Sequence, residues 1–157
     1  MSFDADYSCW GRSIAAIEPY TSPLSLLTLR IGSRILLPTL NNLRVFVVED
    51  EALVAMNLEM ILEDLGCQVV GPAMRFDKAF AMVEKGIKAD AAILDVNVAG
   101  RDVFPLAEKL GELGIPMVFA TGYDQTVFPE KWSRSPAVRK PYTLEDVEKA
   151  LKEALAD

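Results

Sequence analysis

The most consequential absence in this 157-residue sequence is histidine, of which it has none. Without an imidazole, the chain has neither a Ser-His-Asp nor a Cys-His nucleophile system, and no histidine general base. Most zinc sites are excluded for the same reason. Any chemistry must therefore rely on carboxylates, lysine, threonine or tyrosine.

Cysteine is scarce as well. Cys9 and Cys67 are the two cysteines, and they form neither a C-x-x-C pair nor a metal-binding spacing. Two cysteines do not make a disulfide framework, so we expect a reducing, cytoplasmic setting.

The sequence also lacks basic clusters, nucleotide-binding glycine motifs and a long uncharged apolar run. Its net charge is −7, without a Lys/Arg block, which argues against binding to nucleic acid. Neither G-x-G-x-x-G nor G-x-x-x-x-G-K-[ST] occurs. The apolar stretch around residues 24–40 is short and carries Arg30 and Arg34, which argues against a membrane span.

What is present has the composition of a globular protein, 51% hydrophobic and 25% charged, and the length of one domain. Residues 1–42 balance three arginines against three acids, so the whole net charge lies in residues 43–157. We expect 1–42 to be an N-terminal extension, partly helical or disordered, and 43–157 to be the folded domain. Apolar residues at helical spacing predict an amphipathic helix over 23–37.

From residue 43 onward, β-rich runs alternate with helical patterns. The expected strands cover 43–48, 67–70, 91–94, 116–120 and 136–139. The expected helices cover 52–65, 77–85, 103–113 and 144–154, with a short helix or loop over 125–132 and Thr143 as the last helix's N-cap. This alternation predicts an α/β fold, a doubly wound parallel sheet covered on both faces.

Polar residues follow four of these strands. Glu49, Asp50 and Glu51 follow the first, Asp95 closes the buried third, and Thr121 and Lys140 end the fourth and fifth. Parallel strands open on one edge of the sheet, so these groups should converge there. Taken singly, the acids could cap helices, Thr121 could serve a turn and Lys140 could be a surface lysine.

The residue types at this edge suit phosphoryl chemistry. Clustered carboxylates need a cation, and all-oxygen ligands on an open edge suit Mg²⁺ or another divalent cation. A carboxylate beside that ion can attack a phosphoryl group and form an aspartyl-phosphate. A lysine and a hydroxyl can share the phosphoryl charge.

Four motifs, at residues 45–51 (VFVVEDE), 93–98 (ILDVNV), 118–123 (VFATGY) and 139–142 (RKPY), resemble the receiver domain of two-component response regulators. The resemblance covers residues 43–157. It implies a flavodoxin-like sheet with strand order 2-1-3-4-5. It also implies a signalling domain that catalyses only its own phosphorylation and dephosphorylation.

The resemblance assigns a role to each site residue. Asp95 would be the phosphoacceptor and a metal ligand, Asp50 a direct ligand, Glu49 a ligand through water, and Asn97 a ligand through its backbone carbonyl.

Thr121 would bond the phosphoryl group and Lys140 would pair with it. The peptide bond between Lys140 and Pro141 would be cis.

Two positions depart from the family pattern. Ala137 replaces the aromatic residue whose movement usually reports phosphorylation, and Ala99 replaces a proline. The run 119–123, FATGY, is similar to the FAT GUY subfamily of receivers, which lacks that aromatic residue. We hypothesise that residues 122–135 become ordered when Thr121 is drawn to the phosphoryl group.

The leading functional prediction is a stand-alone receiver, phosphorylated on Asp95 by a histidine kinase or a phosphotransfer protein and acting through its surface without an output domain. The alternative is a degenerate receiver that only binds proteins. A phosphatase of the haloacid dehalogenase type would need a second aspartate where Asn97 stands. The oligomeric state is left open.

Overall fold

Alternate side chains of the central strands face opposite sides of the sheet. In the computed structural model, which describes residues 39–122 and 128–156, β1 (Arg44–Val48) turns Val45 and Val47 into one core cluster, and Phe46 and Val48 into the other. Strands buried on both faces require a layer of helices on each side.

The five main strands are parallel and lie in the order β2-β1-β3-β6-β7. Counted along the chain this is 2-1-3-4-5, so the predicted flavodoxin-like order is confirmed. Around β1 lie β2 (Gln68–Ala73), β3 (Ala91–Asp95), β6 (Met117–Thr121) and β7 (Ala137–Arg139).

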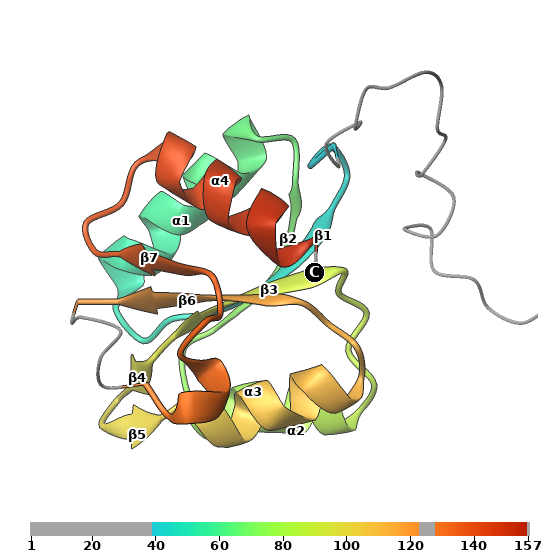
Figure 1. Ribbon diagram of the computed structural model, residues 1–157, viewed down its shortest axis with the longest axis vertical. Helices are drawn as coiled ribbons and strands as arrows, with labels where there is room; N and C mark the ends of the chain where they lie inside the picture. Colours follow the sequence, from blue (N-terminus) through green and yellow to red (C-terminus); the bar gives the residue numbers. More distant parts are fainter. Residues whose placement is uncertain (1–38, 123–127, 157) are drawn as a thin grey trace, which may run out of the picture. The chain divides into compact units, whose positions relative to one another are not determined.

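Two helices cover each face of the sheet (Figure 1). α1 (Ala52–Asp64) and α4 (Leu144–Ala154) bury Leu58, Leu62 and Leu151 against one face. α2 (Phe76–Glu84) and α3 (Phe104–Glu112) close the other, where Phe46, Phe119, Leu106 and Leu110 are fully buried. The four predicted helices are confirmed to within one or two residues at their ends.

Thr143 caps the start of α4, as predicted, and the cap is reciprocal with Asp146, which was not predicted. The backbone N–H of Asp146 donates to Thr143 Oγ1 (3.3 Å), and the backbone N–H of Thr143 donates to Asp146 Oδ2 (2.9 Å). The cap anchors the chain just after the Lys140–Pro141 peptide bond, which is cis as predicted.

Two parts of the sheet differ from the prediction. β2 does not end at residue 70 but continues to Ala73, because Gly71 adopts a φ of +113° and the pairing with β1 resumes at Val48 after a register shift. A two-stranded antiparallel hairpin, β4 (Asn97–Val98) and β5 (Arg101–Asp102), follows β3 and was not predicted.

Some predictions fall partly or wholly outside the described residues. The helix over 23–37 does so entirely, and the extension over 1–42 stays a prediction, although Leu40 packs into the core. Of the segment 122–135, residues 123–127 lie outside, and Glu130–Trp132 (η3) is a 3-10 turn. Among the helices that the structure describes, none is long and apolar enough to cross a membrane.

Candidate functional site

Three carboxylates meet at the carboxyl edge of the sheet. Glu49 and Asp50 come directly after β1, and Asp95 is the last residue of the neighbouring β3. One oxygen from each lies within 4.8 Å of the others. Because β1 and β3 pair in parallel, the fold brings these acids together as the sequence predicted.

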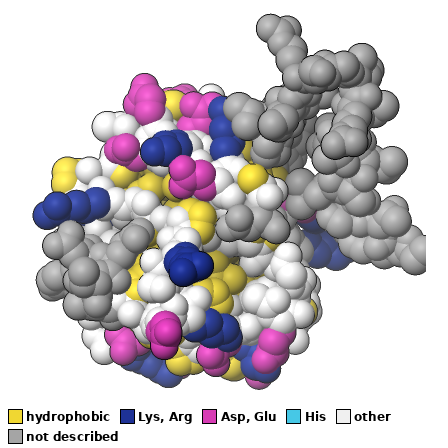
Figure 2. Space-filling model, viewed as in Figure 1, with side chains coloured by type: hydrophobic (Ala, Val, Ile, Leu, Met, Phe, Trp, Pro, Cys, Tyr) yellow, Lys and Arg dark blue, Asp and Glu magenta, His cyan; other side chains and the backbone are white. Residues whose placement is uncertain are grey.

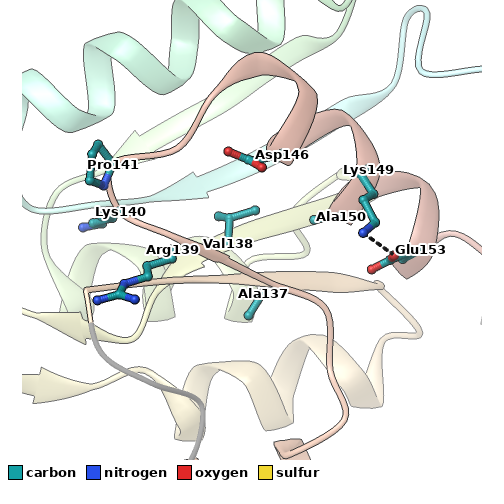
Figure 3. A pocket seen from close by; sticks show the side chains of 9 residues that line it. All are labelled: Ala137, Val138, Arg139, Lys140, Pro141, Asp146, Lys149, Ala150 and Glu153. Carbon is teal, nitrogen blue, oxygen red and sulfur yellow. Dashed lines mark ion pairs between the residues drawn. The ribbon is translucent and has the colours of Figure 1, made fainter.

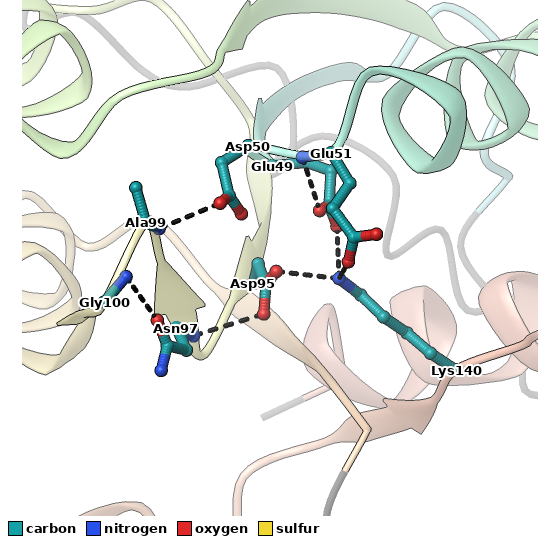
Figure 4. Close-up of polar contacts among 8 residues, drawn as sticks. All are labelled: Glu49, Asp50, Glu51, Asp95, Asn97, Ala99, Gly100 and Lys140. Carbon is teal, nitrogen blue, oxygen red and sulfur yellow. Dashed lines mark hydrogen bonds and ion pairs between the residues drawn. The ribbon is translucent and has the colours of Figure 1, made fainter.

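Lys140 reaches into this cluster from the end of β7 (Figure 4). Its Nζ lies 2.7 Å from Asp95 Oδ2 and 2.7 Å from Glu49 Oε2, with Glu51 Oε1 further away at 3.9 Å. The side chains of Lys140, Glu49 and Asp95 are 17%, 1% and 10% exposed. One largely buried ammonium therefore faces two buried carboxylates.

The pKa values reflect this crowding. Burial raises the pKa of the Glu49 carboxyl to about 7; the negative Asp95 adds to the rise, and Lys140 opposes it. Burial disfavours the charged form of Lys140, but its bonds to Asp95 and Glu49 outweigh this, so the pKa of Lys140 is above its ordinary value. The site thus holds one charged lysine, Lys140, that faces two carboxyl groups, those of Glu49 and Asp95.

The donor atoms fit a hard divalent cation. All three acids of the cluster present oxygen, the ligand that Mg²⁺ prefers. Among the described residues, Glu49 Oε2 is buried without a hydrogen bond, although it forms the ion pair with Lys140. Glu49 Oε2 thus already faces the Lys140 ammonium, and the fit to a cation rests on the three carboxylate oxygens that lie within 4.8 Å of one another.

The other two predicted residues border the cluster. The backbone N–H of Asn97 donates to Asp95 Oδ1 (3.1 Å). Thr121 is a buried residue that ends β6, and its carbonyl accepts the backbone N–H of Lys140 (2.9 Å). Both lie at the predicted edge, and their roles stay predictions.

Two neighbours of the site were missed from the sequence. The backbone N–H of Ala99 donates to Asp50 Oδ2 (2.9 Å), and Tyr142 lies buried near the acids. Burial, together with the charges of Glu49 and Asp95, raises the pKa of the Tyr142 phenol. The contact of Ala99 with Asp50 depends on a turn in which Ala99 and Gly100 both have positive φ. The sequence gives little sign of this turn, because alanine rarely adopts a positive φ.

Ala137 is one of the residues that line a hollow of about 520 Å³ along β7 and α4 (Figure 3), and its methyl group packs against the core cluster that contains Phe119. The polar lining of the hollow comes from Arg139, Lys140, Asp146, Lys149 and Glu153. A methyl group here has no ring to move, so the structure offers no counterpart to the usual aromatic switch at this position.

The surface carries both signs of charge. On the face shown in Figure 2, acidic and basic side chains are interspersed, and no broad basic patch is visible. This agrees with the net charge of −7 and lends no support to a nucleic-acid interface on that face.

Comparison with known proteins supplies relatives in sequence and in fold. The solution structure of SdrG from Sphingomonas melonis Fr1 is 41% identical, with a TM-score of 0.66, and the match covers 76% of this chain and 99% of SdrG. The response regulator PhyR from Brucella abortus is 31% identical with a TM-score of 0.62, matched over 73% of this chain and 48% of PhyR. No protein-family model matches the chain.

Among curated proteins, the transcriptional regulatory protein PdtaR of Mycobacterium tuberculosis is 31% identical over 117 residues. The match covers 72% of this chain and 57% of PdtaR, so the chain spans little more than half the length of this relative.

A further solved structure that is similar to the chain is the BeF3-activated conformation of SdrG, at 42% identity and a TM-score of 0.63.

Proposed function

The chain belongs to the response regulator receiver family, and we propose that it is a signalling switch that takes a phosphoryl group onto Asp95. The observation that carries this proposal is the pairing of Lys140 with Asp95 and Glu49 beside Asp50, at one edge of the sheet. The existence of a BeF3-activated form of the similar SdrG supports it.

In the proposed reaction, a carboxylate oxygen of Asp95 attacks the phosphorus of a phosphohistidine on a kinase or phosphotransfer partner. The new O–P bond forms as the P–N bond breaks, and the bonding electron pair stays on the donor's imidazole nitrogen. The donor histidine lies outside these 157 residues, which contain none.

The residues around Asp95 prepare it for this step. Lys140 holds Oδ2 by a 2.7 Å hydrogen bond, and the Asn97 N–H holds Oδ1, so the carboxylate cannot rotate freely. The Lys140 ammonium supplies positive charge for the incoming phosphoryl oxygens, and the Thr121 hydroxyl bonds one of them. Positioning of this kind accounts for much of the catalysis in phosphoryl transfer.

Glu49, Asp50 and Asp95 would hold the divalent cation, with the Asn97 carbonyl completing the protein's share. When bound, the ion neutralises negative charge on the transferring group. Without it, the buried Glu49 and the partly exposed Asp50 beside Asp95 would repel a phosphoryl dianion.

The phosphoryl group leaves by hydrolysis. A water oxygen attacks phosphorus, the O–P bond to Asp95 breaks, and inorganic phosphate departs as the carboxylate is restored. We assign the chain to the FAT GUY receivers from Phe119-Ala-Thr-Gly122 and from the methyl group at position 137. In this proposal the signal leaves through the receiver's own surface.

The test is the intact mass of the protein after incubation with Mg²⁺ and a small phosphodonor such as acetyl phosphate. Wild type should gain one phosphoryl group, and Asp95→Asn should gain none. Chelation with EDTA should abolish the gain. No adduct on wild type would favour a binding module, and an adduct on Asp95→Asn would assign the phosphoacceptor to another residue.

A further inference from the structure

The hairpin that follows β3 has a turn that its sequence does not favour. Ala99 and Gly100 at its tip have φ of +52° and +82°. Glycine adopts such angles at little cost, but the left-handed region costs alanine on the order of 1 kcal/mol. A strained alanine at a turn calls for a compensating contact.

That contact is with the acidic cluster. The Ala99 N–H donates to Asp50 Oδ2 at 2.9 Å, and Figure 4 shows the tip of the hairpin pointing at this carboxylate. Asn97 braces the turn, since its Oδ1 accepts the Gly100 N–H (2.7 Å) while its own N–H donates to Asp95. Backbone donors of one hairpin therefore touch two of the three acids.

The opposite strand of the hairpin is tied to α2. The Arg101 guanidinium forms an ion pair with Asp77 and lies 4.1 Å from the centre of the Phe76 ring. Phe76 is buried at the start of α2. A cation over an aromatic face and an ion pair each contribute modestly, and together they fix the hairpin against this helix.

We propose that the Asn97–Asp102 hairpin is a clamp that positions Asp50 for the divalent cation, with the Ala99 amide as its contact and Arg101 as its anchor. This rests on the proposed function. Asp50 lies at a partly exposed edge, where its carboxylate would otherwise sample several rotamers. Holding Oδ2 reduces that freedom before the ion arrives and leaves the other oxygen to bind it.

The clamp also explains the departure from the family pattern at position 99. Proline has no N–H to donate, and its φ is locked near −65°. The proline usual in the family could make neither this turn nor this hydrogen bond. Because coupling is reciprocal, a bound cation must in turn stabilise the hairpin and its seat on α2.

The test is calorimetric titration of the full chain with Mg²⁺ for wild type, Ala99→Pro, Ala99→Gly and Arg101→Ala. Ala99→Pro should raise the dissociation constant about tenfold, the value of one charge-assisted hydrogen bond. Ala99→Gly keeps the donor and the turn, so it should bind within about twofold of wild type. Arg101→Ala, which touches no acid of the cluster, should weaken binding about threefold.

Amide exchange of residues 98–102 in wild type gives a second readout, and Mg²⁺ should slow it. Equal Mg²⁺ affinity in Ala99→Pro and Ala99→Gly would overturn the clamp, even if wild type binds Mg²⁺ and is phosphorylated. If Ala99→Pro fails to fold, two results together would overturn the clamp. These are an unchanged Mg²⁺ affinity of Arg101→Ala and an amide exchange of residues 98–102 that Mg²⁺ does not slow in wild type. A wild type that binds no Mg²⁺ would overturn the proposed metal site as well.

Discussion

The two edges of the sheet each carry a charged pair, and they are built differently. At the amino edge, Arg44 at the start of β1 meets Asp90, just before β3. Asp90 Oδ1 accepts from the guanidinium (2.7 Å), and Oδ2 accepts from Nε (2.9 Å) and from the Arg44 backbone N–H (3.0 Å). At the carboxyl edge, Lys140 faces both Glu49 and Asp95.

The difference lies in balance and in access to water. Arg44 is 29% exposed and Asp90 11%, and both oxygens of Asp90 accept hydrogen bonds from Arg44. Such a pair joins the start of β1 to the residue before β3. At the carboxyl edge one ammonium, that of Lys140, faces two buried carboxyl groups, and burial raises the pKa of one of them, Glu49, to about 7. The amino edge thus matches its charges, whereas the carboxyl edge crowds acids around one lysine, as the proposed function requires.

We expect the largest change in stability from removing the charge of Lys140 at the carboxyl edge. Lys140→Met leaves Glu49 and Asp95 buried without their counter-charge, and we expect a loss of about 3 kcal/mol in the free energy of unfolding. Urea unfolding at pH 7 measures it.

Lys131→Met is the matched control, because Lys131 is an exposed lysine paired with Glu108 at 3.4 Å. It should change stability little. If Lys140→Met were as stable as this control, Lys140 would not be needed to offset the buried charges of Glu49 and Asp95.

A smaller loss is expected at the amino edge. Asp90→Asn should cost about 2 kcal/mol at pH 7, because it removes charge-assisted bonds while water can still reach Arg44. The side-chain hydrogen bonds of Arg44 hold the pKa of Asp90 below its ordinary value of 3.8. A carboxyl whose pKa is lower in the folded state than in the unfolded state stabilises the fold at pH values above its unfolded-state pKa. This stabilisation is lost as the pH falls through the folded-state pKa.

The stability difference between wild type and Asp90→Asn should therefore be full at neutral pH and shrink below pH 3.8. Urea unfolding of both proteins across this range measures it. Glu112→Gln, which breaks an exposed pair with Lys109, should show no such dependence. A difference that persists in acid would mean that the Asp90 charge is not its source.

The smallest effect concerns Tyr142, beside the buried edge. Among the described residues, its buried hydroxyl has no hydrogen-bond partner. Tyr142→Phe removes that unsatisfied group without emptying the core, and we expect a gain of about 1 kcal/mol by urea unfolding. A loss of similar size would show instead that the hydroxyl is bonded, for example through water.

Much of the fold was predictable because its signals are local and repeated. Buried strands such as 91–94 are continuous apolar runs, helices end at glycines, and Thr143 caps α4. The site followed from topology, since parallel strands must present Asp50, Asp95 and Lys140 at one edge.

What could not be predicted depends on backbone angles and on contacts across the fold. Ala99-Gly100 is not a recognised hairpin signal, because alanine rarely takes a positive φ, so β4 and β5 were missed. The extension of β2 depends on Gly71, which looked like a stop signal. The burial of the Tyr142 hydroxyl could not be read from a residue that follows a proline.

The position of Lys140 late in the chain has a consequence for synthesis on the ribosome. Glu49, Asp50 and Asp95 are all made before it, and β7 is the last strand to emerge. A nascent chain that has reached β6 holds the clustered acids with no lysine to neutralise them, so those strands repel at the edge where they must pair. The final strand therefore brings the one lysine of the cluster, so completion of the sheet and neutralisation of the clustered acids are coupled.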